Sequence, residues 1–222
     1  MPPSVPCLHE SNDACLRDCA VPKLTVHPLT PERWPDFVRL FGERGVGGGC
    51  WCMGWRLPDR QQYLQQKGDS NREAMHALVR GGCVPGLLAY DGPEPIGWCA
   101  VAPREAYPAL QRSPSRKAVD GERVWSITCV YVARSHRRQR LSTKLIEAAV
   151  AYVRSRGGHI VEGYPVPVKP GVTSTNYAFT GFVSAFEEAG FTECLRRSKT
   201  RPIMRFYTDR AHKRLKRSGA RK

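Results

Sequence analysis

Residues 124–154 read VWSITCVYVARSHRRQRLSTKLIEAAVAYVR. The first nine residues are mostly β-branched and aromatic, which is typical of a strand. From Leu145 to Val153 apolar side chains recur every three or four positions, and this spacing predicts an amphipathic helix that ends at Gly157-Gly158. A basic turn, Arg134 to Arg140, connects the two. The stretch therefore predicts a strand, a basic turn and a helix in direct succession.

This succession is a candidate anion site. When a strand runs straight into a helix, the first N–H groups of the helix are unpaired and point towards one place. The helix dipole adds positive potential there. Arg137, Arg138 and Arg140 surround this place, and Ser142 and Thr143 supply hydroxyls. A diphosphate is the expected ligand, although the residues alone leave open a basic solvated turn before an ordinary surface helix.

The segments on either side complete an α/β pattern without internal repeats. Thr30 followed by Pro31 predicts a helix start, and Asp91-Gly92-Pro93 predicts the turn of a hairpin. The predicted elements are strand 24–27, helices from Thr30 and from Asn71, hairpin strands 87–90 and 96–101, strand 160–164, helix 183–189, and closing strands 191–197 and 203–207, with 50–55 as a strand or tight loop.

Length and charge divide the chain into three parts. At 222 residues it is long enough for one domain with its own core. We expect an N-terminal extension at 1–22, one domain at 23–208 and a basic C-terminal tail at 209–222. Arg196 to Lys222 hold twelve Lys or Arg and one acid, out of a net charge of +15. Such a tail either binds nucleic acid or another polyanion, or is a solvated tail.

The number of cysteines and the lack of long apolar runs indicate the cellular compartment of the protein. Nine cysteines cannot all pair internally, and several lie in apolar strand-like runs, so we expect reduced thiols. The N-terminus has no secretory pattern and no run reaches membrane-span length, which predicts a cytoplasmic protein without membrane contact. Cys7, His9, Cys15 and Cys19 lack the spacing of a zinc site, so we expect no metal.

Two short motifs resemble those of one enzyme family. Arg137-Arg138-Gln139-Arg140-Leu141-Ser142 resembles the acyl-CoA signature of the GNAT N-acetyltransferases, Gln/Arg-x-x-Gly-x-Gly/Ala, which follows their central strand. Phe186-Glu187-Glu188-Ala189-Gly190-Phe191 is similar to the family's Tyr-Glu-Lys-x-Gly-Phe, and the order of elements from Leu24 to Tyr207 also fits. The resemblance implies an α/β (α+β) fold with a mixed, splayed central sheet flanked by helices.

The same resemblance implies a function and a set of cofactor contacts. The enzyme would transfer an acetyl group from acetyl-CoA to an amine by direct attack in a ternary complex, without a metal. A backbone N–H of the central strand would polarise the thioester carbonyl. Small-molecule and peptide amines both remain open as acceptors, and a homodimer remains open. The implied cofactor-binding residues are Val130, Tyr131 and Val132 for pantetheine, and Arg137, Arg138, Gln139, Arg140, Leu141, Ser142 and Thr143 for pyrophosphate.

Three residues depart from the family pattern. Arg140 stands where the signature has glycine, Phe186 where many members have a tyrosine acid, and Ser126 where many have an acidic base. Serine is a poor base, so Glu162 on the next strand is our candidate for the catalytic general base. The alternative for Glu162 is a structural pair with an arginine.

Other residues and function classes remain as alternatives. Cys129 is a conceivable nucleophile, but a strand cysteine without an obvious base is more typical of packing. Trp51, Trp55 and Trp98 either line an acceptor pocket or, as we favour, belong to the core. The departures suggest a non-catalytic acyl-CoA-binding protein as one alternative function. The basic tail suggests a nucleic-acid-binding protein as another.

Overall fold

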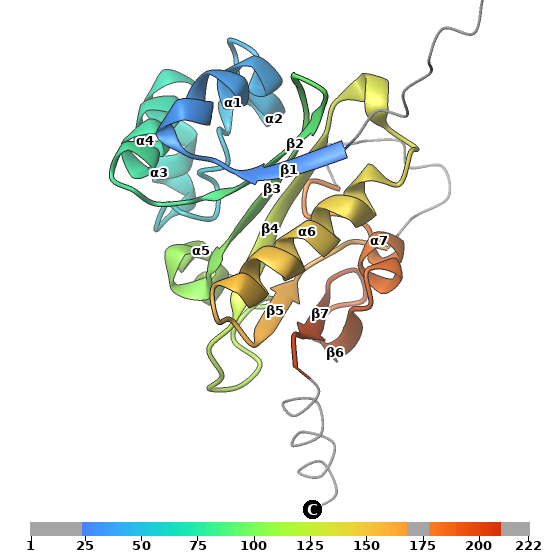
Figure 1. Ribbon diagram of the computed structural model, residues 1–222. Coiled ribbons are helices and arrows are strands. Elements are labelled where there is room, and N and C mark those ends of the chain that lie inside the picture. Colours follow the sequence, from blue (N-terminus) through green and yellow to red (C-terminus); the bar gives the residue numbers. More distant parts are fainter. Residues whose placement is uncertain (1–23, 168–177, 210–222) are drawn as a thin grey trace, which may run out of the picture.

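A mixed sheet of seven strands forms the centre of the protein, as seen in a computed structural model that describes residues 24–167 and 178–209 (Figure 1). The strand order is β1-β2-β3-β4-β5-β7-β6. Only β4 and β5 are parallel neighbours; the other neighbouring pairs are antiparallel. The strands are β1 Leu24–Pro28, β2 Gly86–Asp91, β3 Glu94–Pro103, β4 Trp125–Val132, β5 Ile160–Gly163, β6 Thr192–Arg196 and β7 Pro202–Tyr207.

Helices cover both faces of this sheet (Figure 1). The helices are α1 Trp34–Phe41, α2 Val46–Gly49, α3 Arg60–Gln65, α4 Asp69–Arg80, α5 Pro108–Arg112, α6 Leu141–Ser155 and α7 Val183–Glu188, with short 3₁₀ turns η1 Pro31–Arg33, η2 Arg104–Ala106 and η3 Arg134–His136. Alternate residues of β2 show the two layers. Leu87 packs in the core under α6 and α7, whereas Leu88 packs in the core under α1 and α4.

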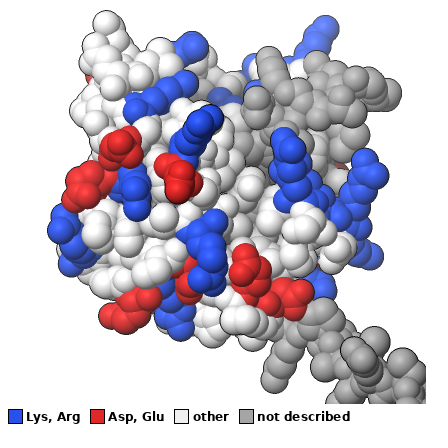
Figure 2. Space-filling view, turned by 90° about the horizontal axis from the view of Figure 1, so that it is seen from above, with Lys and Arg blue, Asp and Glu red and all other residues white. Residues whose placement is uncertain are grey.

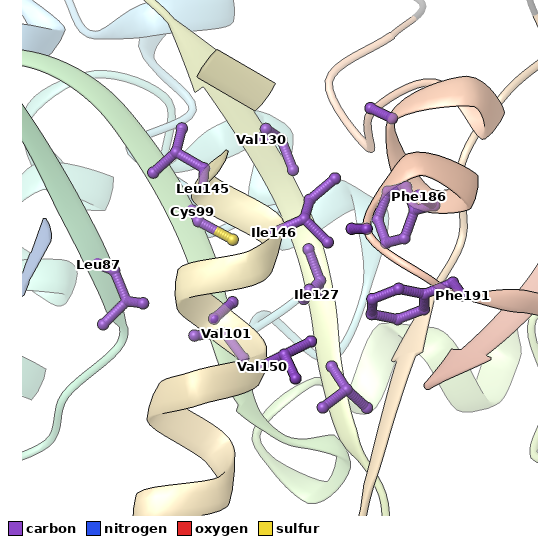
Figure 3. Close-up of a cluster of buried hydrophobic side chains, with 14 of the residues drawn as sticks. Leu87, Cys99, Val101, Ile127, Val130, Leu145, Ile146, Val150, Phe186 and Phe191 are labelled. Carbon is purple, nitrogen blue, oxygen red and sulfur yellow. The ribbon is translucent and has the colours of Figure 1, made fainter. Parts of the chain in front are cut away.

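The core under α6 is the larger apolar cluster. Leu145 and Ile146 of α6 lie over Ile127 and Val130 of β4, and Phe186 of α7 closes the cluster (Figure 3). At about 25 cal/mol per Å² of buried apolar surface, such burial is the main favourable contribution to stability. The cluster therefore fixes α6 and α7 against the strand from which the candidate site is built.

A bulge in β4 changes which side chains face each layer. Val101 pairs with Ile127 and Ala100 pairs with Cys129, so Thr128 is an extra residue on β4. Because of this extra residue, Ile127 and Val130 both face the core under α6. Cys129 packs instead with the layer of α1 and α4. The bulge lies at the point where β4 loses its next neighbour.

The sheet opens between β4 and β5. The two strands pair over three residues each, ending with Ile127 opposite Gly163, while β4 continues to Val132. Beyond that point β4 has no pairing with β5, and a gap opens on the side of β4 away from β3. The predicted mixed sheet that splays at its centre is confirmed.

Most predicted elements are present, and the differences lie in the first half of the chain. The predicted cap Asn71 lies inside α4, which begins at Asp69; Asn71 is buried and donates from Nδ2 to the Gly49 carbonyl at 3.3 Å. Residues 50–55 form tight turns rather than a strand, with Trp51 and Cys52 at positive φ. The predicted extension 1–22 lies outside the described residues, as does the predicted tail 209–222 apart from Asp209.

Candidate active site

The turn between β4 and α6 contains two left-handed backbone positions. Arg138 has a φ of +64° and Arg140 a φ of +58°. Arg140 is the residue before α6, and the first helical hydrogen bond runs from Lys144 N to Arg140 O at 3.2 Å. The three N–H groups between them have no carbonyl partner in the same helix. They lie at the positive end of the helix dipole, where an anion is stabilised.

The left-handed backbone at Arg140 explains the glycine of the acyl-CoA signature. Glycine adopts this conformation freely, whereas for any other residue the left-handed backbone costs about 1–2 kcal/mol of conformational free energy. Arg140 takes the same backbone shape, and its guanidinium lies 3.2 Å from Glu188 Oε2 on α7. The same oxygen accepts a hydrogen bond from Thr143 Oγ1 at 2.8 Å. The substitution therefore keeps the shape of the turn and ties it to α7.

The predicted pyrophosphate residues, Arg137 to Thr143, all lie in this one turn. Arg137 Nε donates to the Val132 carbonyl at 3.1 Å, which joins the turn to the end of β4. Leu141 is buried in the core under α6, so only its backbone is available to a ligand. Gln139 lines a small hollow with His136, Lys144 and others. The contribution of these residues to binding stays a prediction.

The predicted pantetheine residues line the gap where β4 and β5 separate. The N–H of Val130 points into this gap and donates to the Phe179 carbonyl at 2.7 Å. Phe182 bridges to Val166 on the other side of the gap. Residues 179–182 therefore lie between the two separated strands. Tyr131 packs with the layer of α1 and α4.

Phe186 forms the apolar edge of this gap. Its side chain is fully buried, and its ring lies so close to Gly163 that a Cβ at Gly163 would overlap it. A Cβ at Gly181 would lie 2.9 Å from the same ring. Two glycines thus make room for Phe186 at the start of the gap. An aromatic ring without a hydroxyl here supplies no proton to a leaving thiolate.

Glu162, the predicted general base, is at the centre of a buried ion-pair network. Its side chain has no exposed surface. Oε1 accepts from Arg104 Nη1 at 3.0 Å and from the Tyr164 hydroxyl at 2.7 Å, and Oε2 accepts from Arg205 Nε at 2.8 Å. Arg205 also binds Asp120 through both terminal nitrogens. Both oxygens of Glu162 are therefore occupied.

Tyr164 connects this network to β4. Its hydroxyl lies 2.9 Å from Ser126 Oγ, and Ser126 pairs with Glu162 across the parallel strands. Burial, reinforced by the charge of Glu162, raises the pKa of Tyr164 well above its usual value. Tyr164 is therefore a neutral hydrogen-bond donor. Ser126, at the position where many family members have an acid, serves this network.

On the other face of the sheet, the aromatic residues divide into core and rim. Trp51 and Trp98 are fully buried in the layer of α1 and α4. Trp55 is half-buried, and its ring lies 6.4 Å from the ring of Phe179, the residue whose carbonyl binds Val130. The expectation of core packing is confirmed for two of the three tryptophans. Trp55 lies near the gap.

Three thiols gather on this same face. Hydrogen bonds link Cys52 to Cys129 and to Cys50, and Cys52 Sγ accepts from Trp98 Nε1 at 3.0 Å. The hydrogen bond of the Cys52 thiol to Cys129, together with burial, raises the pKa of Cys52 well above its usual value. The contact with Cys52 and burial do the same for Cys50. Neutral thiols are poor nucleophiles, so these two contribute to packing.

Residues 24–167 and 178–209 hold neither a metal site nor a membrane-spanning helix. No three His, Cys, Asp or Glu side chains in these ranges are arranged to hold a metal ion. Within the same ranges, no helix has both the length and the apolarity needed to cross a bilayer. Cys7, His9, Cys15 and Cys19, considered above for zinc, lie outside the described residues.

Solved structures of similar fold include members of the GNAT acetyltransferase family. A GNAT-family acetyltransferase from Streptococcus agalactiae aligns over 84% of this chain and 96% of its own, with a TM-score of 0.50 and 11% identity. A GNAT-family structure from Desulfovibrio desulfuricans covers 84% and 99%, with a TM-score of 0.48 and 17% identity. A Salmonella typhimurium acetyltransferase with acetyl-CoA bound covers 84% and 94%, at 0.48 and 13%. No curated protein matches the chain by sequence.

The mixed sheet that opens between β4 and β5, with α6 starting beside the end of β4, fits the fold of a GNAT acyltransferase. The model of the acetyltransferase (GNAT) family matches residues 51–164, half of the chain. The chain therefore belongs to the GNAT acetyltransferase family, and the GNAT-like fold and acyltransferase class expected from its motifs are confirmed.

Several site residues were not predicted from the sequence. Arg104 and Arg205 bind Glu162 from 58 and 43 positions away, and Phe179 binds Val130 from a segment that reads as a loop. One signal was present. Glu162 is an acid inside an apolar strand, and such an acid needs a buried cationic partner, although the sequence does not say which one.

Proposed function

We propose that this enzyme transfers an acetyl group from acetyl-CoA to an amine by direct attack within a ternary complex. The observation that carries the proposal is the turn at Arg137–Thr143, which follows β4 beside the gap and leaves the first N–H groups of α6 without a partner in the helix. A diphosphate fits such a cradle because backbone donors and helix dipole act together. The gap beside it has the extended backbone edge that a pantetheine chain needs.

The strand edge has a defined part in this proposal. The Val130 N–H is the donor that would hold and polarise the thioester carbonyl as the amine attacks. In the present structure the Phe179 carbonyl accepts this hydrogen bond at 2.7 Å. Binding of the thioester would therefore exchange one carbonyl acceptor for another. The donor is already fixed in direction, so it needs no reorganisation during the reaction.

The groups that would carry out the two proton transfers are less completely identified than those that would bind the cofactor. Glu162 as general base stays a prediction: its place at the start of the gap supports that role, whereas its burial and three hydrogen bonds support a structural one. Phe186 cannot protonate the leaving thiolate. A thiolate of CoA is a moderately stable leaving group in water, so its departure without a protein acid is chemically sound.

The first experiment measures binding separately from transfer. A ligand that binds only the folded state adds RT ln(1 + [L]/Kd), about 2.7 kcal/mol at one hundred times Kd, which shifts the melting temperature by several degrees. We expect this shift with acetyl-CoA, and release of free CoA thiol when a panel of amines is added. An unchanged melting temperature at millimolar acetyl-CoA contradicts the proposal.

A non-catalytic acyl-CoA-binding protein is the second candidate, and one observation favours it. Ser126 and Phe186, which replace the family's base and acid, are both buried and engaged in packing or hydrogen bonding. A melting shift without thiol release on any amine would support this candidate. The face shown in Figure 2 mixes Lys and Arg with Asp and Glu, and offers no uniform basic field for nucleic acid.

A further inference from the structure

The edge of β4 that a pantetheine chain would use is already occupied by a short segment of the same chain. Residues 178–182, which we call the strap, lie in the gap between β4 and β5 just before α7. The Phe179 carbonyl accepts the Val130 N–H at 2.7 Å, and this N–H is the donor assigned above to the thioester. The strap and the thioester therefore compete for one hydrogen bond. This argument rests on the proposed function.

The strap is bonded to both sides of the gap. On the side away from β4, the Val166 N–H donates to the Gly181 carbonyl at 3.0 Å, and the Val183 N–H donates to the Val166 carbonyl at 3.0 Å. Within the strap, the Gly181 N–H donates to the Ala178 carbonyl at 2.8 Å and closes a turn. The strap therefore covers a strand edge that would otherwise present unpaired N–H and C=O groups.

The side chains of the strap hold it only weakly. Phe179 and Phe182 are 43% and 41% exposed, so their rings gain little from burial. Thr180 is fully buried, but its hydroxyl has no hydrogen-bond partner in the described part of the chain. A buried hydroxyl without a partner destabilises the conformation that buries it. The position of the strap in the gap therefore depends mainly on its backbone hydrogen bonds.

Gly181 allows the strap to lie against the wall of the gap. Its φ of +84° is favourable for glycine and costly for other residues. A Cβ at this position would lie 2.9 Å from the Phe186 ring and 3.6 Å from Val130 Cγ2. Even an alanine at position 181 would therefore weaken the hold of the strap on the gap.

We propose that the strap is an autoinhibitory segment, which blocks the thioester site in the free enzyme and leaves the edge of β4 when acetyl-CoA binds. The Val130 N–H then exchanges the Phe179 carbonyl for the thioester carbonyl and keeps one hydrogen bond throughout. The apparent dissociation constant is the intrinsic constant divided by the fraction of molecules in which the strap is released. A more stable strap therefore lowers the affinity for acetyl-CoA, and a less stable strap raises it.

Amide hydrogen exchange, followed by NMR, tests the release directly. With saturating acetyl-CoA, we expect the Gly181 and Val166 amides to exchange about tenfold faster or more, because both lose their carbonyl partners in the strap. The Val130 amide should stay protected, since it keeps an acceptor. The Ser142 amide, in the turn that would bind pyrophosphate, should exchange more slowly. Unchanged or slower exchange at Gly181 and Val166 in the bound enzyme overturns the proposal.

Two substitutions in the strap should change the affinity in opposite directions. Gly181→Ala weakens the strap, so the melting temperature of the free enzyme should fall while acetyl-CoA binds about tenfold more tightly. Thr180→Val removes the unpartnered hydroxyl, so the melting temperature should rise while acetyl-CoA binds up to about tenfold more weakly. Thermal melting and calorimetric titration measure both quantities. Weaker binding by Gly181→Ala together with unchanged binding by Thr180→Val contradicts the proposal.

Gly157→Ala is the matched control for the glycine substitution. Gly157 also has a positive φ, +74°, but it follows the end of α6 opposite to the Arg140 turn, and a Cβ there would meet nothing within 4 Å. The same backbone strain should lower the melting temperature without changing the affinity for acetyl-CoA. Equally tighter binding by Gly157→Ala would attribute the effect to a general loss of stability and would reject the strap.

The strap and the proposed function fail in different ways. If acetyl-CoA stabilises Gly181→Ala but not the wild type, the strap is supported as a block, and the function proposed for the wild type fails. If acetyl-CoA binds the wild type while the strap amides stay protected, the strap proposal fails alone. No stabilisation of either protein by acetyl-CoA rejects both.

Discussion

Arg140 shows how one residue can replace a glycine without changing the turn around it. Its φ of +58° is the conformation that glycine supplies at lower cost, and its side chain is tied to Glu188 at 3.2 Å. This side chain is 72% exposed, so the ion pair with Glu188 contributes little to stability. We therefore infer that the Arg140 side chain contacts a ligand beside the path of the diphosphate.

Replacing this residue by glycine tests that inference. Arg140→Gly should keep the fold, because the backbone strain at this position disappears. Binding of acetyl-CoA should weaken moderately, because a contact with the peripheral ribose phosphate is lost, while binding of dephospho-CoA should be unaffected. Arg140→Glu should weaken both strongly, since it places a carboxylate at the positive end of the helix dipole, beside the proposed diphosphate site. Calorimetric titration of the two ligands against each variant measures this, and tighter binding by Arg140→Gly contradicts it.

Glu162 poses a different question, because its two candidate roles predict different measurements. As general base, Glu162→Gln should lower turnover by about 100-fold with little change in acetyl-CoA affinity. As the centre of a buried ion-pair network, it should lower the melting temperature, because Arg104 and Arg205 lose part of their counter-charge. We expect both effects.

A control variant distinguishes the base role from loss of stability. Asp120→Asn removes a carboxylate from the same Arg205 guanidinium but lies on the loop before β4, away from the gap. If Glu162 is the base, Asp120→Asn should keep most of its turnover while Glu162→Gln does not. Equal turnover losses in the two variants would assign Glu162 to structure alone.

At the scale of elements, the separation of β4 from β5 depends on the packing of α7. The ring of Phe186 occupies the space where Gly163 has no side chain, and this contact lies at the last paired residue of β5. A larger residue at Gly163 must move either α7 or the strand end. The width of the gap is therefore set by a glycine and an aromatic ring.

Gly163→Ala makes that dependence measurable. Its Cβ would overlap the Phe186 ring, and overpacking of this kind costs about 1–3 kcal/mol, so the melting temperature should fall by several degrees. Acetyl-CoA binding should weaken as well. Gly121→Ala is the control, because a Cβ there meets nothing within 4 Å. Equal melting temperatures for Gly163→Ala and wild type would show that α7 adjusts without cost.

The elements that could be predicted from the sequence are those with a strong local signal. The strand at 125–132 and the helix at 141–155 are long and regular, and the turn between them is short and basic. The segment 50–55 could not be assigned, because Trp51 and Cys52 adopt positive φ values that non-glycine residues rarely take, while their side chains pack in the layer of α1 and α4. The sequence predicts a start of α4 at Asn71, two residues after the observed start at Asp69. Asparagine is a common capping residue, but Asn71 lies inside the helix and donates a hydrogen bond to the Gly49 carbonyl.

At the scale of the whole molecule, the part of the site that is local in sequence could be predicted, and the part built from distant segments could not. The turn proposed to bind the pyrophosphate is local in sequence, so its residues could be named in advance. The network around Glu162 joins η2, β5, β7 and the loop before β4, and the hydrogen bond from Arg197 to the Lys117 carbonyl joins two loops 80 positions apart. Contacts of this kind depend on how distant segments pack together. They cannot be predicted from the composition or the spacing of any one segment.

The C-terminal residues provide the last prediction, which concerns the charge balance of the molecule. The final strand β7 ends at Tyr207, and Thr208 completes it by bonding to the carbonyls of Gly158 and His159. Truncation after Asp209 keeps these bonds and removes residues 210–222, which contain seven Lys or Arg and no acid. We expect an unchanged melting temperature and unchanged acetyl-CoA binding, because few apolar residues are lost.

Binding of polyanions should respond quite differently to the same truncation. Each phosphate that a protein neutralises lowers the slope of log binding constant against log salt concentration by about 0.7 to 0.9. The seven basic residues of the tail therefore account for a slope of at most roughly −6. We expect the full chain to bind single-stranded RNA at low salt with a slope in this range, and the truncated chain to bind weakly with a slope near zero. Titrations of both chains at several salt concentrations measure this. Equal slopes would place any polyanion contact on the folded domain, and a lower melting temperature after truncation would show that residues 210–222 contribute to the fold.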